Sequence, residues 1–221
     1  MARKLICLGL ALLALAFYYE NKIAIGVCLW FGANFLTVGL GHARGWDNLF
    51  GKRPNGTLPF LRTLYFLPFL IFTWIVWYIF RSVNKDDNWN EVNEQLVLGR
   101  RLLSSEFSGQ YDTIVDLTSE FNECAVMRNH PGYVNIPWLD YSAPTPEALK
   151  AAVQSVKPGR LYIHCAQGRG RTALFAAAYA LEHKMAGTID EAMALLRAKR
   201  PKVRLSSVQR KCIEGYVKLK N

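Results

Sequence analysis

Cys165 and Arg171 are the two residues of this sequence whose types and spacing point most directly to a reaction. A cysteine thiolate is a strong nucleophile, and the planar guanidinium of an arginine binds two phosphoryl oxygens at once. Between them, Gly168 and Gly170 let the backbone turn tightly, so that successive N–H groups converge on one point. This arrangement predicts a loop that binds a phosphate and presents a thiol to its phosphorus atom, which is the chemistry of phosphoester hydrolysis. The expected phosphate-binding residues are Ala166, Gln167, Gly168, Arg169, Gly170 and Arg171.

The segments on either side of this loop predict the elements that must hold it. Residues 160–164 are short and mostly apolar, which predicts a buried strand. Residues 172–185 are rich in alanine and leucine, which predicts a helix whose N-terminus adds partial positive charge beside the thiol and favours the thiolate. Thr172 is predicted to donate its hydroxyl to the sulfur, and His164 to orient the loop by hydrogen bonding.

A cysteine is often only a small buried hydrophobic residue, and a cysteine and an arginine at this spacing occur together by chance in many proteins. The strand, the glycines and the helix together favour the catalytic interpretation. The whole segment, HCAQGRGRT (164–172), resembles the active-site loop of the cysteine-dependent protein tyrosine phosphatase superfamily, in its small dual-specificity branch. The resemblance covers about residues 92–218.

Other segments are similar to that family more weakly, but in the expected order. They are residues 95–102 and 111–118 as core strands, 133–149 as the acid loop with its following helix, and 198–216 as the closing helices. The resemblance implies an α/β domain with a central, mostly parallel sheet flanked by helices. It also implies a cysteinyl-phosphate intermediate and a reaction that needs neither a metal nor a cofactor.

The resemblance calls for a general acid that protonates the leaving oxygen, and Asp140 is the best candidate. It follows a strand-like segment and precedes Pro144, so we expect it on a loop. The same carboxylate would later deprotonate the water that attacks the thiophosphate. A solvated turn or a helix cap is the alternative role for a lone aspartate. Asp116 is the second candidate for the acid, whereas Glu120 and Glu123 are expected to be exposed.

The order of the predicted elements independently indicates the same fold class. Strands alternate with helices and end with a helix over 188–199 that Thr188 caps, which predicts a parallel sheet with the active site at the carboxyl ends of its strands. We divide the chain into an all-α transmembrane region (1–80), a polar linker (81–92) and a dual-specificity phosphatase-like catalytic domain (93–221).

Three uncharged segments predict that the first region is embedded in a membrane. They cover residues 5–19, 23–41 and 63–80, which are 15, 19 and 18 residues long. About 20 residues of helix cross a bilayer, so the second and third are long enough and the first is short. We expect a helical hairpin, a basic loop and a third span. Four aromatic residues near the end of this region resemble interfacial anchors: Trp74, Trp77, Tyr78 and Trp89.

Two arguments about the side of the membrane give opposite answers. In a three-span arrangement with the N-terminus inside, the basic residues before the third span lie in the cytoplasm and the catalytic domain lies outside. A catalytic thiolate, however, is protected in a reducing compartment. The sequence therefore predicts an integral protein of the cell (inner) membrane and leaves the side of the catalytic domain open.

The charge of the chain indicates anionic partners. The net charge is +10, and residues 1–80 and 81–221 each contribute +5. This suits a bilayer with anionic lipids, or an anionic substrate, and no basic stripe with interleaved aromatics indicates nucleic acid. The densest basic cluster, residues 197–204, is predicted to be a solvated connection between helices, with lipid headgroup contact as the alternative. The four histidines are scattered, and no metal site is predicted.

The predicted substrate is a phosphoprotein, and a phospholipid is the alternative. The dual-specificity resemblance implies a protein phosphatase that acts on phosphotyrosine, phosphoserine or phosphothreonine. The membrane region and Arg169, as a second cation at the loop, favour a phospholipid headgroup such as phosphatidylglycerophosphate or a phosphoinositide. A phosphate-binding pseudoenzyme is a third alternative, but binding alone requires neither a nucleophile nor an acid.

Overall fold

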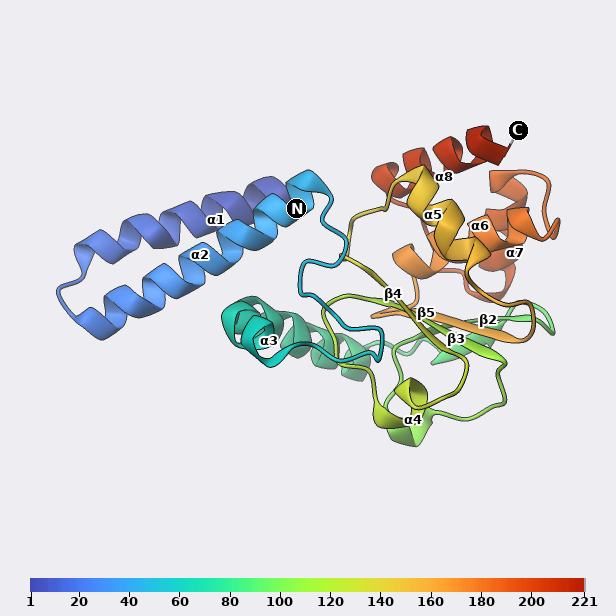
Figure 1. Ribbon diagram of the computed structural model, residues 1–221, viewed down its shortest axis with the longest axis horizontal. Helices are drawn as coiled ribbons and strands as arrows, with labels where there is room; N and C mark the ends of the chain where they lie inside the picture. The colour runs from blue at the N-terminus through green and yellow to red at the C-terminus, as the bar shows by residue number, and fades with distance from the viewer. Residues whose placement is uncertain (221) are drawn as a thin grey trace.

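The computed structural model describes residues 1–220 and consists of a long helical hairpin, a separate helix and an α/β domain (Figure 1). The hairpin, α1 and α2, projects away from the α/β domain, and α3 lies between the hairpin and the sheet. The elements follow the order α1 (Ala2–Leu15), η1 (Ala16–Tyr18), α2 (Lys22–Arg44), α3 (Phe60–Val83), β1 (Trp89–Glu91), β2 (Leu96–Arg100), η2 (Ser104–Glu106), β3 (Thr113–Thr118), α4 (Ala125–Arg128), β4 (Tyr133–Trp138), α5 (Pro146–Gln154), β5 (Leu161–Cys165), α6 (Gly170–Glu182), α7 (Ile189–Lys199) and α8 (Ser207–Lys220).

The sheet confirms the predicted fold class. Its strand order is β1-β2-β5-β3-β4, and all neighbouring pairs except β1 with β2 are parallel. Helices α5 to α8 cover one face (Figure 1), where the main hydrophobic core forms around Leu98, Ile163 and Phe175. The central strand β5 is buried along its whole length, as its apolar sequence predicted. Cys165 is the last residue of β5 and therefore lies in the middle of the edge of the sheet where the parallel strands end.

The structure shortens the predicted linker 81–92. Helix α3 continues to Val83, and β1 begins at Trp89 and pairs antiparallel with β2. The polar composition of this segment did not predict a strand. Because β1 lies at the edge of the sheet, backbone hydrogen bonds to β2 stabilise it without a buried apolar face. The predicted helix over 188–199 is confirmed as α7, with the Thr188 hydroxyl accepting a hydrogen bond from the Glu191 N–H at 3.2 Å.

Glycines allow α1 and α2 to pack closely along the hairpin. A Cβ added to Gly9 would lie 2.6 Å from the Leu36 nitrogen, and one added to Gly32 would lie 2.9 Å from the Gly9 oxygen. Such contacts are too short for any larger side chain, so the two backbones touch at these positions. Small residues at a helix interface are typical of packing inside a membrane, where van der Waals contact stabilises association.

Asn34 joins α2 to α3 at the proline inside α3. Pro68 cannot donate a backbone hydrogen bond, and its ring disturbs the preceding turn of the helix. The buried amide of Asn34 donates to the Tyr65 oxygen at 2.9 Å and accepts from the Phe69 N–H at 3.2 Å. One side chain of α2 therefore satisfies two backbone groups of α3, as a helix with an internal proline requires in apolar surroundings.

The loop between α2 and α3 packs on the α/β domain that follows α3. Lys52 in this loop is only 3% exposed, and its ammonium donates to Asp116 Oδ2 at 2.5 Å and to the Thr118 oxygen at 3.0 Å. The loop also accepts a hydrogen bond from the Glu123 N–H at the Gly56 oxygen, at 2.9 Å. The segments before and after α3 therefore form one packed unit.

Candidate active site

The loop that contains Cys165 connects β5 to α6 through one strained glycine position. Gly168 has a φ of +65°, and a Cβ there would lie 2.3 Å from the Gly99 oxygen of β2. Only glycine fits both the left-handed conformation and this close approach. The second predicted hinge, Gly170, is instead the first residue of α6 and has no positive φ. The tight turn therefore depends on Gly168 alone.

Hydrogen bonds turn the carbonyl groups of this loop away from its pocket. The Arg101 N–H binds the Cys165 oxygen at 2.8 Å, and Trp77 Nε1 binds the Ala166 oxygen at 2.9 Å. Arg200 binds the next two carbonyls, with Nε 2.8 Å from the Gly168 oxygen and Nη2 3.3 Å from the Gln167 oxygen. In a trans peptide the N–H points opposite to the C=O, so the amides of residues 166–169 are directed to the other side. That side is a pocket of about 60 Å³ that Cys165 lines.

Arg171 is buried at the carboxyl ends of β3 and β4, and Glu120 is its main partner. Its guanidinium is 1% exposed and binds both oxygens of Glu120, at 2.7 and 2.9 Å, and the Trp138 oxygen at 2.8 Å. Although burial opposes it, the charge of Arg171 lowers the pKa of Glu120, which stays ionised. The expectation that Glu120 is exposed was wrong. A buried arginine needs a carboxylate partner, but Glu120 is distant from Arg171 in the sequence and only the sheet brings the two together.

Two donors in this part of the loop are buried without a protein partner. Within residues 1–220, neither Arg171 Nε nor the hydroxyl of Thr172 makes a hydrogen bond. Both groups are less than 2% exposed, and a buried donor without an acceptor is costly in free energy. An anion in the pocket and the sulfur of Cys165 are the acceptors that such donors require.

Asp140 lies on the turn after β4, as the sequence predicted, and its carboxylate reaches the pocket. Oδ1 is 3.2 Å from Arg171 Nη2, and the side chain is 51% exposed at the mouth of the pocket that Cys165 lines. Desolvation by the surrounding protein raises the pKa of Asp140 above its ordinary value, and the Glu120 carboxylate adds to this while Arg171 opposes it. A carboxyl group with a raised pKa can donate a proton nearer neutral pH.

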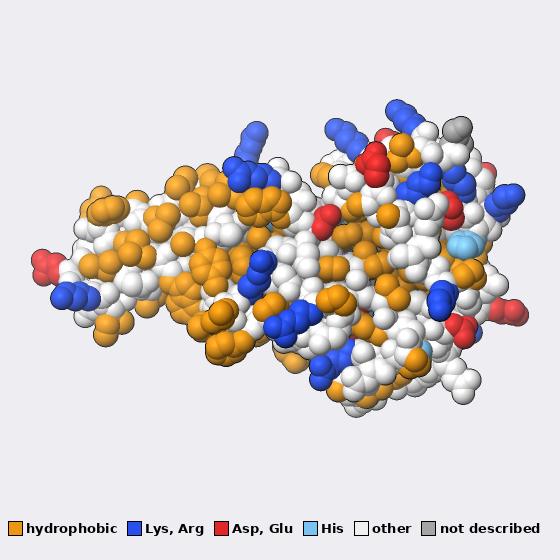
Figure 2. All heavy atoms as spheres, in the orientation of Figure 1, with side chains coloured by type: hydrophobic (Ala, Val, Ile, Leu, Met, Phe, Trp, Pro, Cys, Tyr) orange, Lys and Arg blue, Asp and Glu red, His pale blue; other side chains and the backbone are white. Residues whose placement is uncertain are grey.

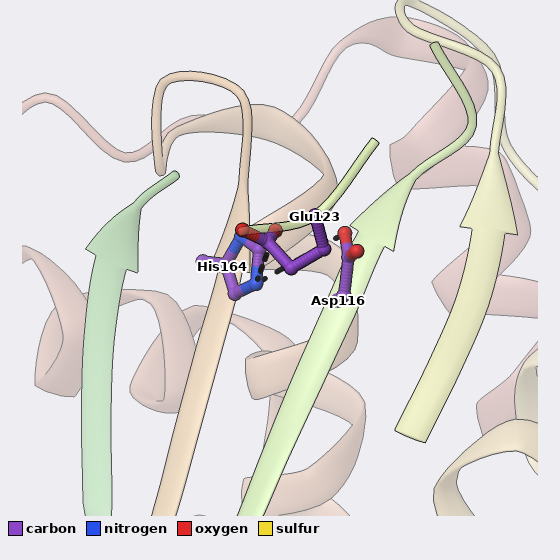
Figure 3. A group of neighbouring side chains, drawn as sticks. All are labelled: Asp116, Glu123 and His164. Atoms are coloured by element: carbon purple, nitrogen blue, oxygen red, sulfur yellow. Dashed lines mark ion pairs between the residues drawn. The ribbon is translucent and has the colours of Figure 1, made fainter. Parts of the chain in front are cut away.

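Asp116, the second candidate for the acid, belongs to a buried ion-pair cluster with His164 and Glu123 (Figure 3). Lys52 binds Asp116 Oδ2 at 2.5 Å, and the Tyr133 hydroxyl donates to the same oxygen at 2.7 Å. Burial alone raises the pKa of Asp116, but the charge of Lys52 holds it below its ordinary value, so Asp116 stays ionised and cannot serve as an acid. The ammonium of Lys52 also supplies the positive charge that a cation would bring to these carboxylates.

His164 and Glu123 differ from their predicted roles. Glu123 is buried rather than exposed, with Oε2 3.5 Å from His164 Nε2. Neither ring nitrogen of His164 makes a hydrogen bond within residues 1–220, so the predicted bond to the loop is not formed there. The ring instead stacks on Tyr162 at 5.5 Å, and burial lowers the pKa of His164 against the pull of Asp116 and Glu123.

The basic residues around the pocket have different roles from those predicted. Arg169 lines the pocket, but its charge is paired with Asp86 at 2.8 Å and its guanidinium lies over Phe80. The cluster 197–204 is only partly a solvated connection, because Arg200 is buried against the loop carbonyls. Arg204 is exposed, lines the pocket with Cys165 and has no ion-pair partner within residues 1–220. Among the described residues that line the pocket, Arg204 is therefore a cation without an ion-pair partner.

Helix α3 contributes directly to the site, which the sequence did not indicate. Trp77 is buried and donates to the Ala166 oxygen, and Trp74 donates to the Glu120 oxygen at 3.0 Å. Arg101 lies over the Trp77 ring at 5.2 Å from its centroid. The interpretation of these tryptophans as interfacial anchors was wrong for Trp77, because its indole supports the loop that contains Cys165.

Comparisons with known proteins give one curated relative and several solved structures with the same fold. No family model matches the chain. It is 35% identical over 92 residues to the phosphatidylglycerophosphate phosphatase PTPMT2 of Arabidopsis thaliana, a match that covers 39% of this chain and 40% of that protein. The chain therefore spans less than half of the length of this curated relative.

Solved structures share the fold at low sequence identity. PTPMT1 in complex with PI(5)P matches with a TM-score of 0.52 and 18% identity, over 60% of this chain and 96% of that one. The active form of Tk-PTP matches with a TM-score of 0.50 and 17% identity, over 59% and 97%. The human tyrosine phosphatase-like serine/threonine/tyrosine-interacting protein matches with a TM-score of 0.51 and 15% identity, over 60% and 97%. The chain therefore has the fold of these structures, and part of it is similar in sequence to the curated phosphatase.

Proposed function

We propose that the chain is a membrane-held phosphatase that hydrolyses a lipid phosphomonoester through a cysteinyl-phosphate intermediate. The observation that carries the proposal is the pocket over Cys165, toward which the loop amides are directed while Arg171 Nε and Thr172 Oγ1 lack partners. A phosphate would accept hydrogen bonds from the amides and from Arg171. The Thr172 hydroxyl would donate to the sulfur and make it a better leaving group.

The chemistry proceeds in two steps on this geometry. Cys165 attacks phosphorus while Asp140 donates its proton to the departing oxygen of the lipid alcohol. Asp140, now ionised, accepts a proton from a water that attacks the cysteinyl phosphate, and inorganic phosphate leaves with Cys165 as thiolate. Arg171 binds the equatorial oxygens in both steps, and Glu120 holds its guanidinium in place.

Three features support a lipid rather than a phosphoprotein. The apolar helix α3 supports the loop through Trp77, so the pocket is adjacent to a segment with affinity for a membrane. Arg204 is a free cation beside the pocket and can bind a second anionic group of a headgroup. The curated relative is described as a phosphatidylglycerophosphate phosphatase. Protein phosphatase activity, which the dual-specificity resemblance implied, becomes the opposing outcome of the test.

The test is phosphate release by the detergent-solubilised full-length protein. Phosphatidylglycerophosphate and phosphoinositides in mixed micelles are compared with phosphotyrosine and phosphoserine peptides. The proposal predicts a clear preference for lipid in kcat/KM. Peptide turnover with little lipid turnover would make the chain a protein phosphatase, and no turnover of either would favour the phosphate-binding pseudoenzyme.

Asp140→Asn is expected to slow hydrolysis of lipid alkyl phosphates by about 10² to 10⁴-fold. It should slow p-nitrophenyl phosphate far less, because nitrophenolate leaves without a proton. The acid must be protonated, so wild-type turnover should fall as pH rises through the raised pKa of Asp140, and the variant should lack this descending limb. Asp190→Asn, on the exposed surface of α7, is the control. Equal losses of turnover on both substrates would show that another group is the general acid.

The packing of the loop 45–59 suggests how the chain sits in a membrane. Two helices are long and apolar enough to cross a bilayer, α2 and α3. Lys52 before α3 is bound to Asp116 after it, and a bilayer cannot separate two residues in contact. We therefore infer that only the hairpin spans the membrane and that α3 does not cross it. The first half of α3 lies beside the middle of α2, at Asn34, so its exposed apolar side chains face the lipid. Figure 2 shows hydrophobic side chains gathered over the hairpin and over α3.

The lengths of the helices and the charges fit this arrangement. The α1 helix with η1 is about 27 Å long and α2 about 34 Å, close to the bilayer core of about 30 Å. The tip of the hairpin combines exposed Phe17 and Tyr18 with polar Glu20, as at a membrane interface. The basic loop and the catalytic domain then share the cytoplasmic side. This arrangement agrees both with the cytoplasmic location of basic loops and with a reducing compartment for the catalytic thiolate.

Single cysteines in a cysteine-free background test this topology. In intact cells, a membrane-impermeant maleimide should label Glu20→Cys at the hairpin tip. It should label Asn55→Cys and Lys85→Cys, which flank α3, only after the membrane is permeabilised. Different accessibility of Asn55→Cys and Lys85→Cys would show that α3 crosses the bilayer and would overturn this arrangement.

A further inference from the structure

A second cavity adjoins the pocket over Cys165 and extends along α3. Its volume is about 190 Å³, compared with about 60 Å³ for the phosphate pocket. Asp140, Tyr141, Ala166 and Gln167 line both cavities. The larger space is therefore directly beside a ligand whose phosphate lies over Cys165.

Polar side chains form a minor part of the lining of this cavity. Glu120, Asp140 and Gln167 belong to the end that adjoins the loop, and His42 and Thr73 also line the cavity, as does Met1. Beyond them the lining is mainly apolar and comes from both parts of the chain: Phe50, Phe69, Phe72, Val76, Trp77, Phe121 and Leu139. A polar end that leads into an apolar chamber suits a molecule with a charged head and a hydrocarbon tail.

The cavity opens on the membrane-facing side of α3. Phe72 and Val76 line it, yet they are 56% and 43% exposed. Ile75 and Ile79, also on α3, are exposed as well but do not line the cavity. The apolar rim of the cavity thus belongs to the same exposed helix surface that we assigned to the lipid.

We propose that this cavity binds the headgroup-proximal part of one acyl chain of the lipid phosphomonoester while its phosphate lies over Cys165. This inference rests on the proposed function and names how its substrate is recognised. A cavity of about 150 Å³ accommodates a benzene ring. The space along α3 therefore takes only several carbon atoms, and the rest of the chain stays in the bilayer against α3. A lipid would then be cleaved without leaving the membrane.

The test compares lipid chain length with a substrate that has no acyl chain. Wild-type kcat/KM is measured for dibutanoyl, dihexanoyl and dioctanoyl phosphatidylglycerophosphate, each below its critical micelle concentration, and for p-nitrophenyl phosphate. We expect kcat/KM to rise with chain length. Val76→Trp, which fills the cavity from α3, should reduce the ratio of kcat/KM for the dioctanoyl lipid to that for p-nitrophenyl phosphate at least about tenfold. That loss equals about 1.4 kcal/mol, less than the burial of two methylene groups.

Two further variants make the result decisive. Ile75→Trp places the same side chain on the exposed surface outside the cavity and should leave the ratio unchanged. Thr73→Trp fills the cavity from another position and replaces Val76→Trp if that variant fails to fold. A ratio unchanged by both cavity variants, or no chain-length dependence in the wild type, overturns the acyl-chain site while leaving the phosphatase intact. Wild-type hydrolysis of no phosphomonoester would instead contradict the proposed function.

Discussion

Cys165→Ser is expected to abolish phosphate release from every substrate, by a factor on the order of 10⁴ or more. The serine hydroxyl remains protonated near neutral pH, and an alkoxide is a far poorer leaving group than a thiolate when the phosphoenzyme is hydrolysed. The amides, Arg171 and Arg204 remain in place, so the affinity for a lipid phosphate should be retained. Steady-state phosphate release and binding of the lipid to the inactive variant measure the two properties separately.

Covalent trapping provides the direct measurement of this nucleophile. Acid quenching of the wild type during turnover of a radiolabelled phosphomonoester should leave phosphate on the peptide that contains Cys165, and the variant should carry none. Cys124→Ser, at a half-buried cysteine outside the pocket, is the matched control and should keep both turnover and trapping. Retained turnover in Cys165→Ser would assign the reaction to another nucleophile.

Arg171→Lys has the second largest expected effect, a loss of about 10² to 10³-fold in kcat, or about 2.7–4 kcal/mol. The guanidinium binds Glu120 with two nitrogens and still has Nε free for a phosphoryl oxygen. An ammonium is a point charge and cannot bind both oxygens of Glu120 and a phosphoryl oxygen in one plane. The lost interaction is made mainly in the transition state, so kcat should fall more than KM rises.

The lysine keeps a positive charge beside Glu120, so the fold should survive the substitution. The thermal unfolding midpoint of the detergent-solubilised variant checks this point. Arg160→Lys, at the partly exposed residue before β5, is the control and should change neither kcat nor the midpoint by much. A loss below about tenfold in Arg171→Lys would mean that the loop amides alone stabilise the transition state.

Glu120 and Arg200 illustrate which parts of the site the sequence could not provide. The loop motif predicted Cys165 and Arg171 because both belong to one short segment whose glycine and flanking elements set its conformation locally. Glu120 lies 51 residues before its partner Arg171, and Arg200 lies 32 residues after the Gly168 carbonyl that it binds. Charged residues are usually exposed, so the reasonable prediction for Glu120 was a surface position. Only the parallel sheet, which gathers the ends of β3, β4 and β5, brings these groups together.

Helix α3 demonstrates the same limit for the membrane region. Its length and apolar composition predicted a third span. Length and hydropathy indicate that a helix is stable in a bilayer, but they do not indicate which of its faces packs against protein. The contacts of Lys52, Trp74 and Trp77 show that one face of α3 is packed on the catalytic domain. An apolar helix with one face on protein is suited to lie along a membrane as well as to cross it.

By itself, the sequence determined the fold class, and it predicted the nucleophile loop and the affinity for a membrane. These properties follow from local patterns: the periodicity of apolar residues, the spacing of Cys165 and Arg171, and long uncharged segments. The tertiary structure alone decided the partner of Arg171, the role of Lys52 in fixing Asp116, the free cation Arg204 and the cavity along α3. Those properties depend on contacts between residues far apart in the chain, and burial and pairing of charge are set by what surrounds a side chain rather than by its neighbours in sequence.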